Sequence, residues 1–159
     1  MENISVKVFK KDDGYFPMPI SLENYYEQIK NYKSEGYSQV ILTADVLLEV
    51  LKQAFVSHDA KIMNIELLDD QDVYQEELNA LIDKVSENRD MFIVLFDDLA
   101  DLNHSDSIEL REIKLLIRKD EVANIVSVAN NGYIHGEGNL SIIDSLNAAI
   151  SSALGRKQC

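Results

Sequence analysis

Aspartates that follow short apolar segments are the residues of this 159-residue chain whose type and spacing could do chemistry. Asp69 and Asp70 follow the segment 62–68, and Asp97 and Asp98 follow the segment 91–96. If both segments are parallel strands, their carboxyl ends meet at one sheet edge, where open α/β sheets bind ligands. Carboxylate oxygens at that edge could hold Mg²⁺ or Ca²⁺. Such a site would suit a metal-dependent hydrolase or phosphotransfer enzyme.

The same aspartates have a structural interpretation, because Asp after a strand commonly caps the helix that follows. We favour this interpretation and therefore expect neither a metal nor a cofactor. The set Asp69, Asp70, Asp97 and Asp98 is kept as the alternative metal site.

Asp106 and the pair Glu112-x-Lys114 form a second group that could surround a metal ion. Their order is similar to that of nucleases of the restriction-enzyme type, in which the acids bind a divalent metal and the lysine steadies developing charge. The site requires a strand over residues 108–119, because Glu112 and Lys114 diverge on a helix. The apolar pattern of this segment fits a helix, and as a strand it needs a bulge between Leu110 and Ile113.

Other catalytic patterns are missing from the sequence. The three histidines, His58, His104 and His135, are far apart and form no zinc-binding pattern. There is no phosphate-binding P-loop, dinucleotide-binding glycine motif or nucleophile elbow. We therefore favour a role that does not involve catalysis.

The net charge of −13 is the most unusual property of the chain, with 28 acidic and 15 basic residues. Residues 61–110 hold fourteen of the acids and only three of the bases. Such a charge repels nucleic acids and anionic lipids, which bind through Lys and Arg. It favours association with a basic protein.

We therefore expect a small acidic protein-binding module, an inhibitor of the immunity or antitoxin kind that neutralises a basic partner such as a nuclease toxin. The helix 72–88 and the polar loop 97–107 should carry the contact. The expected contact residues are Asp69, Asp70, Asp72, Glu76, Glu77, Asp97, Asp98, Asp101 and Asp106. A second alternative is a structural subunit that forms a homo-oligomer through residues 148–153 or through the edge of an N-terminal hairpin.

Periodicity and turn residues predict the elements that must position these side chains. An N-terminal hairpin over 4–18 has its second arm at a sheet edge, because Pro17 and Pro19 lack backbone donors. The other predicted strands are 39–43, 62–68, 91–96 (central), 122–128 and 133–135, and the predicted helices are 22–32, 44–55, 72–88 and 141–154, the last ending at Gly155.

Short apolar strands that alternate with helices predict a single layered α/β domain over residues 1–159. The expected sheet is mixed and parallel at its centre, with flanking helices, an N-terminal hairpin and a C-terminal helix. The longest uncharged apolar run, 91–96, is far shorter than the ~18–20 residues of a membrane span. A single cysteine, Cys159, and the absence of a basic leader followed by an apolar run favour the cytoplasm.

Overall fold

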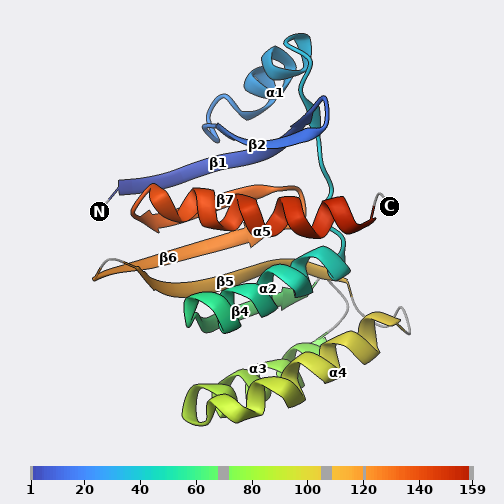
Figure 1. The fold of residues 1–159 in the computed structure, drawn as a ribbon. Coiled ribbons are helices and arrows are strands. Elements are labelled where there is room, and N and C mark those ends of the chain that lie inside the picture. Colours follow the sequence, from blue (N-terminus) through green and yellow to red (C-terminus); the bar gives the residue numbers. More distant parts are fainter. Residues whose placement is uncertain (1, 68–71, 105–108, 120, 158–159) are drawn as a thin grey trace.

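The computed structural model describes residues 2–67, 72–104, 109–119 and 121–157 (Figure 1). The strands are β1 (Glu2–Lys11), β2 (Gly14–Pro19), β3 (Ser38–Gln39), β4 (Lys61–Leu67), β5 (Leu110–Lys119), β6 (Val122–Ala129) and β7 (Tyr133–Gly138). The α-helices are α1 (Tyr25–Ser34), α2 (Ala44–His58), α3 (Asp72–Glu87), α4 (Phe92–His104) and α5 (Ser141–Lys157), and a short 3₁₀ turn, η1 (Arg89–Met91), precedes α4.

The chain is a mixed α/β fold in which helices pack on one antiparallel sheet. The strand order is β2-β1-β7-β6-β5-β4, and β3 adds a short pairing to β1. All these pairings are antiparallel, so the expectation of a sheet with a parallel centre is wrong. Only two or three residues separate β1 from β2, β5 from β6 and β6 from β7 in the sequence, and such short connections can link only antiparallel strands.

The segment 91–96, predicted as the central strand, is helical: Met91 ends η1 and residues 92–96 form the start of helix α4. Phe92, Leu95 and Leu99 are buried, whereas Ile93 and Val94 are 67% and 47% exposed. Buried residues at steps of three and four are typical of a helix that packs one of its faces against the core. The predicted loop 97–107 is likewise wrong over residues 97–104, which belong to α4, and residues 105–107 lie outside the described part of the chain.

The second predicted inner strand, 39–43, is also wrong, since only Ser38 and Gln39 pair with a neighbouring strand. The chain then crosses toward α2, with Leu42 buried and Ile41 77% exposed. The Leu42 N–H donates to the carbonyl oxygen of Asn130 at 2.7 Å, which fixes the crossing against the β6–β7 turn.

Other predicted elements are confirmed. The hairpin β1–β2 forms with β2 at one end of the sheet, and β4 lies at the opposite end rather than at the centre. The segment 108–119, for which helix and strand were both open, forms a strand over residues 110–119 and not the helix that its apolar pattern fits. Leu110 pairs with Leu67 and Glu112 with Glu66, which leaves Arg111 as the extra residue of the bulge that a strand requires here. The C-terminal helix forms but runs past Gly155.

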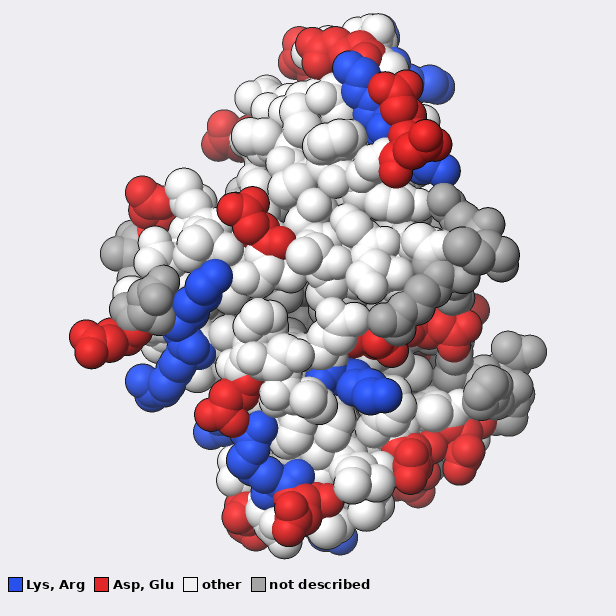
Figure 2. All heavy atoms as spheres, viewed as in Figure 1, with Lys and Arg blue, Asp and Glu red and all other residues white. Residues whose placement is uncertain are grey.

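Helices α2 and α5 lie side by side across one face of the sheet (Figure 1). Figure 2, viewed from this side, shows uncharged residues over much of its centre. In the described part of the chain, no helix combines the length and the apolar character that a membrane span requires.

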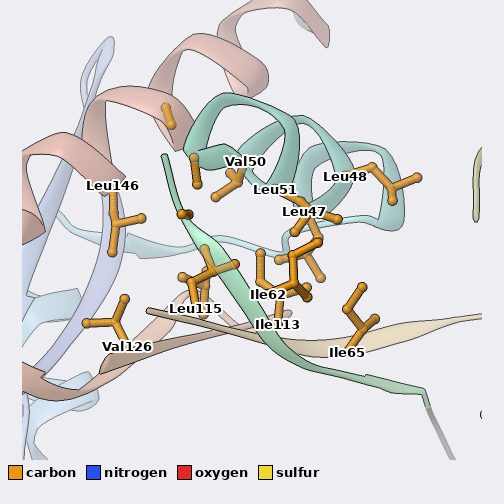
Figure 3. Close-up of a cluster of buried hydrophobic side chains, with 14 of the residues drawn as sticks. Leu47, Leu48, Val50, Leu51, Ile62, Ile65, Ile113, Leu115, Val126 and Leu146 are labelled. Atoms are coloured by element: carbon orange, nitrogen blue, oxygen red, sulfur yellow. The ribbon is translucent and has the colours of Figure 1, made fainter. Parts of the chain in front are cut away.

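The hydrophobic core lies between these helices and the sheet (Figure 3). From α2, Leu47 and Leu51 point toward Ile62 of β4 and Ile113 of β5, and all four side chains are at most 4% exposed. Seven residues of α2 are buried, so this helix is deeply packed. The core fixes which face of each strand is buried, because successive side chains alternate between the two faces of a sheet.

The opposite face of the sheet carries polar side chains over β5, β6 and β7, and helix α1 lies at its β1 end. Tyr32 of α1 packs on Phe9, with ring centroids 5.1 Å apart, and its hydroxyl donates to the carbonyl oxygen of Pro19 at 2.6 Å. No residue of α1 is buried, and Tyr26 is 85% exposed. The helix therefore covers the sheet through a few tyrosines rather than through a core of its own.

Candidate functional site

Helices α3 and α4 form an antiparallel hairpin that extends beyond strand β4 and carries most of the acidic segment (Figure 1). Their inner faces are apolar and buried: Leu78, Ile82 and Val85 on α3, and Phe92, Leu95 and Leu99 on α4. Because the apolar residues recur at helical spacing, the charged residues between them must face outward.

A stacked aromatic group attaches the hairpin to α2. The rings of Phe55 and Phe92 are nearly parallel, with centroids 3.9 Å apart and an interplanar angle of 7°. The guanidinium of Arg89 lies 4.0 Å from the centroid of the Phe55 ring and pairs with Asp59 at 2.9 Å. Since Phe92 and Arg89 both lie about 4 Å from one ring centre, they must occupy its opposite faces. This sandwich fixes the turn between α3 and α4.

A glutamine attaches the other end of the hairpin to the outermost strand. The Gln75 side-chain oxygen accepts from the Leu67 N–H at 3.0 Å, and its amide nitrogen donates to the Ile65 carbonyl at 2.7 Å. Both backbone groups belong to β4, whose outer side has no strand partner in the described sheet. Gln75 thus orients α3 and satisfies part of the exposed strand edge.

The hairpin presents an acidic surface, which we define as Glu76, Glu77, Asp97, Asp98 and Asp101. All five residues are exposed. Because α3 and α4 are antiparallel, the first half of α3 and the second half of α4 lie at the same end of the hairpin. Within the described residues, no cation lies in ion-pair distance of any of the five carboxylates. Acidic side chains gather at the lower right of Figure 2, where α4 lies in Figure 1.

Two aliphatic side chains adjoin these carboxylates on the outer face of α4. Ile93 precedes Asp97 by one helical turn, and Val94 precedes Asp98 by the same step. Ile93 and Val94 are 67% and 47% exposed. The outer face of α4 therefore combines an apolar patch with an adjoining stripe of negative charge.

The structure places only part of the predicted contact set. Asp69, Asp70 and Asp106 lie outside the described residues, and Asp72 is the first residue of α3, with a side chain that is not described. The premise of the alternative metal site is wrong for Asp97 and Asp98, because they lie within a helix and not at the end of a strand. In the described ranges, no three acidic, histidine or cysteine side chains are close enough to hold a metal ion.

No protein-family model, no curated protein and no solved structure matches this chain. Function therefore has to follow from the geometry and the charge of the described residues.

A second group of polar side chains, of which the sequence pattern connected only Glu112 and Lys114, lies on the open face of the sheet. Glu112 and Lys114 share that face because residues 110–119 form a strand. His135 Nε2 lies 3.2 Å from Glu112 Oε1. Ser127 belongs to β6, the strand between β5, which carries Lys114, and β7, which carries His135. The sequence pairs Glu112 with Lys114, and only the strand register brings Ser127 and His135 beside them. Asp106 of the nuclease-like pattern lies outside the described residues.

Lys7 of β1 is a buried cation that the sequence also does not reveal. Its side chain is 0% exposed, its ammonium donates to the Asn131 carbonyl, and the Phe9 and Tyr25 ring centroids lie 5.9 and 5.8 Å from Nζ. Burial lowers the pKa of Lys7 to about 8. Tyr25 of α1 helps to cover this position, so Lys7 is enclosed only when α1 is in place.

Proposed function

We propose that this chain is a protein-binding module that neutralises a basic partner, in the manner of an immunity protein or antitoxin, and that it acts in the cytoplasm. The observation that carries the proposal is the outer face of α4, on which exposed carboxylates adjoin exposed Ile93 and Val94 and have no cation in ion-pair distance among the residues that the structure describes. A basic protein with a matching patch, such as a nuclease toxin, is the partner that this surface fits.

The charge of the acidic surface supports fast association with such a partner. Glu76, Glu77, Asp97, Asp98 and Asp101 project from two helices that are fixed to the body of the protein at both ends of the hairpin. Like charges held on rigid elements create a field that steers an oppositely charged protein toward the surface. This steering weakens with salt, because the Debye length is only ~10 Å at 0.1 M ionic strength.

The apolar patch supplies what charge alone does not provide. Protein interfaces combine a desolvated apolar centre with a polar rim, and charged pairs at the rim contribute mainly to association rate and specificity. Ile93 and Val94 can form such a centre, while Asp97, Asp98 and Asp101 form one side of the rim. A surface of pure charge would bind basic proteins without selectivity, and the aliphatic pair gives the site a defined contact.

The proposal is tested by affinity enrichment from native lysate of the source cells at low salt, with two matched variants. In the first, Asp97→Asn, Asp98→Asn and Asp101→Asn remove three charges from the acidic surface. In the second, Glu23→Gln, Glu27→Gln and Glu35→Gln remove three exposed charges from α1 and the residues that flank it, which gives the same net charge.

We expect the parent and the α1 variant to retain the same basic protein, which salt releases, and the α4 variant to lose it. A retained nuclease should then lose activity when the parent chain is added. Equal retention by both variants would indicate simple ion exchange and contradict the proposal, as would the failure of the parent chain to retain any basic protein.

A further inference from the structure

The strand register aligns five polar residues in one row across the open face of the sheet. Asn64 pairs with Lys114, Lys114 with Ser127, Ser127 with His135, and His135 with Ser5. Directly opposed residues of antiparallel strands have Cβ atoms about 4.5–5.5 Å apart. An ammonium, a hydroxyl and an imidazole therefore stand next to each other at the centre of this row.

A hollow of about 190 Å³ lies over this part of the sheet, lined by Lys114, Ile125, Ser127, His135, Gly136 and Glu137. Ser127 is 4% exposed, and among the described residues its hydroxyl has no hydrogen-bond partner. Lys114 is exposed and has no carboxylate within 4.0 Å in the same part of the chain. Two donors of the hollow thus remain available to a ligand.

His135 is held in position by neighbours that do not line the hollow. Tyr133 stacks on the imidazole, with ring centroids 4.9 Å apart and an interplanar angle of 16°. The Tyr133 hydroxyl lies 3.1 Å from the Ser5 hydroxyl, which itself donates to the carbonyl oxygen of Ile20 at 2.5 Å. Glu112 accepts a hydrogen bond from Nε2 of His135. When the ring is protonated, its Nδ1–H is therefore left to donate to another acceptor. Such outer contacts are how proteins preorganise a binding group.

We propose that this hollow binds the anionic oxygen group, carboxylate or phosphate, of a small molecule. Lys114 and Ser127 bind the anion directly, and His135 adds charge when its ring is protonated. Charge-assisted hydrogen bonds to such oxygens are among the strong polar interactions of proteins. The site goes beyond the proposed partner binding, because it lies on the open face of the sheet and shares no residue with the acidic surface of α3 and α4.

Two carboxylates near the hollow restrict which anions it can accept. The charge of Glu112 is directed to His135, which it keeps in position. Glu137 lines the hollow two residues along β7 and is exposed, so its charge weakens the binding of a simple anion without preventing it. A ligand that places a hydrogen-bond donor beside its anionic group would turn this repulsion into a contact. The favoured class is therefore a small anion that also carries an amino or hydroxyl group.

The test is an NMR titration of the full-length protein with sodium phosphate and, separately, sodium acetate, followed through the ring signals of His135. These signals are assigned by their loss in His135→Asn. The variants are Lys114→Met and Ser127→Ala in the hollow, Glu137→Gln at its rim, and Lys84→Met on α3 as a control that removes an exposed lysine elsewhere.

We expect a saturable shift of the His135 signals with one or both anions, and the anion that binds distinguishes a phosphate site from a carboxylate site. Lys114→Met should weaken binding by about tenfold, and Ser127→Ala should weaken it by a smaller factor. Glu137→Gln should strengthen binding, and Lys84→Met should leave it unchanged. The proposal is wrong if neither anion gives a saturable shift, or if Lys114→Met and Lys84→Met bind equally well.

Discussion

The buried ammonium of Lys7 should make the stability of this protein depend on pH in a way that a single substitution removes. Lys7 has one carbonyl acceptor and two aromatic rings around it, and no carboxylate lies within 4.0 Å in the described residues. Methionine has a similar length and no charge. Lys7→Met therefore removes the desolvation cost of the charged form and loses the hydrogen bond to Asn131.

The sign and size of the effect follow from the pKa of Lys7, which falls from 10.5 to about 8 because the group is buried. Between these two values the unfolded chain binds more protons than the folded one, so the free energy of unfolding rises with pH. One pKa unit corresponds to about 1.4 kcal/mol, which sets an upper limit of about 3 kcal/mol for the whole shift. From about pH 7.5 to about pH 9.5 the linkage relation gives a rise of about 2 kcal/mol.

Two tyrosines set the upper end of this window. Burial raises the pKa of Tyr25 and of Tyr32 above the usual 10.0. A group whose pKa is raised on folding loses its stabilising contribution as the pH rises above its unfolded value. These tyrosines therefore lower stability only near pH 10 and above, outside the range in which Lys7 acts.

The assay is urea unfolding followed by circular dichroism at about pH 7.5, 8.5 and 9.5, on the parent, on Lys7→Met and on Lys84→Met as an exposed control. We expect the difference in unfolding free energy between the parent and Lys7→Met to move by about 2 kcal/mol across this range, in favour of the parent. The unfolding free energy of Lys84→Met should change with pH in the same way as that of the parent. A constant difference between the parent and Lys7→Met at all three pH values would refute the reasoning.

Two further substitutions test how the helices are attached to the sheet. Asn124 is fully buried, donates to the Ile117 and Val122 carbonyls and accepts from the Asn139 N–H, so Asn124→Ala should lower the unfolding free energy by about 3 kcal/mol in urea titrations. A loss below about 1 kcal/mol would show that these bonds contribute little. Phe92→Ala removes the ring stacked on Phe55 and should cost about 3–4 kcal/mol. Hydrogen exchange should then increase first in α3 and α4, and uniform exchange over the whole chain would contradict a separately attached hairpin.

Sequence patterns predicted the elements whose own residues show a clear period. They failed where a segment was too short or too uniform to show one. The alternation in β1 is a local signal, and the hairpin that it predicts is present, with Asp12 and Asp13 in the turn. The run 91–96 is uniformly apolar and has no period of its own. Its helical period appears only when Leu99 and Leu102, which continue the steps from Phe92 and Leu95, are included. Because this segment is a helix, the sheet lacks the strand on which the predicted parallel centre depended.

The candidate sites differ in how far the sequence could reveal them. The acidic surface follows from composition, because charge on an amphipathic helix must face solvent, and the exposure of Glu76, Glu77 and Asp97 follows from that rule. The hollow on the sheet does not follow from composition. Lys114, Ser127 and His135 are separated by 13 and 8 positions, and only the pairing of three strands brings them into one row.

The two ends of the sheet have a consequence for how copies of this chain can meet. At one end, Pro17 and Pro19 deprive β2 of backbone donors, and at the other a bulge at Met63 and the side chain of Gln75 interrupt the outer strand β4. Each device hinders a foreign strand from adding to the sheet. Growth into fibrils by strand addition is therefore opposed at both ends of the sheet.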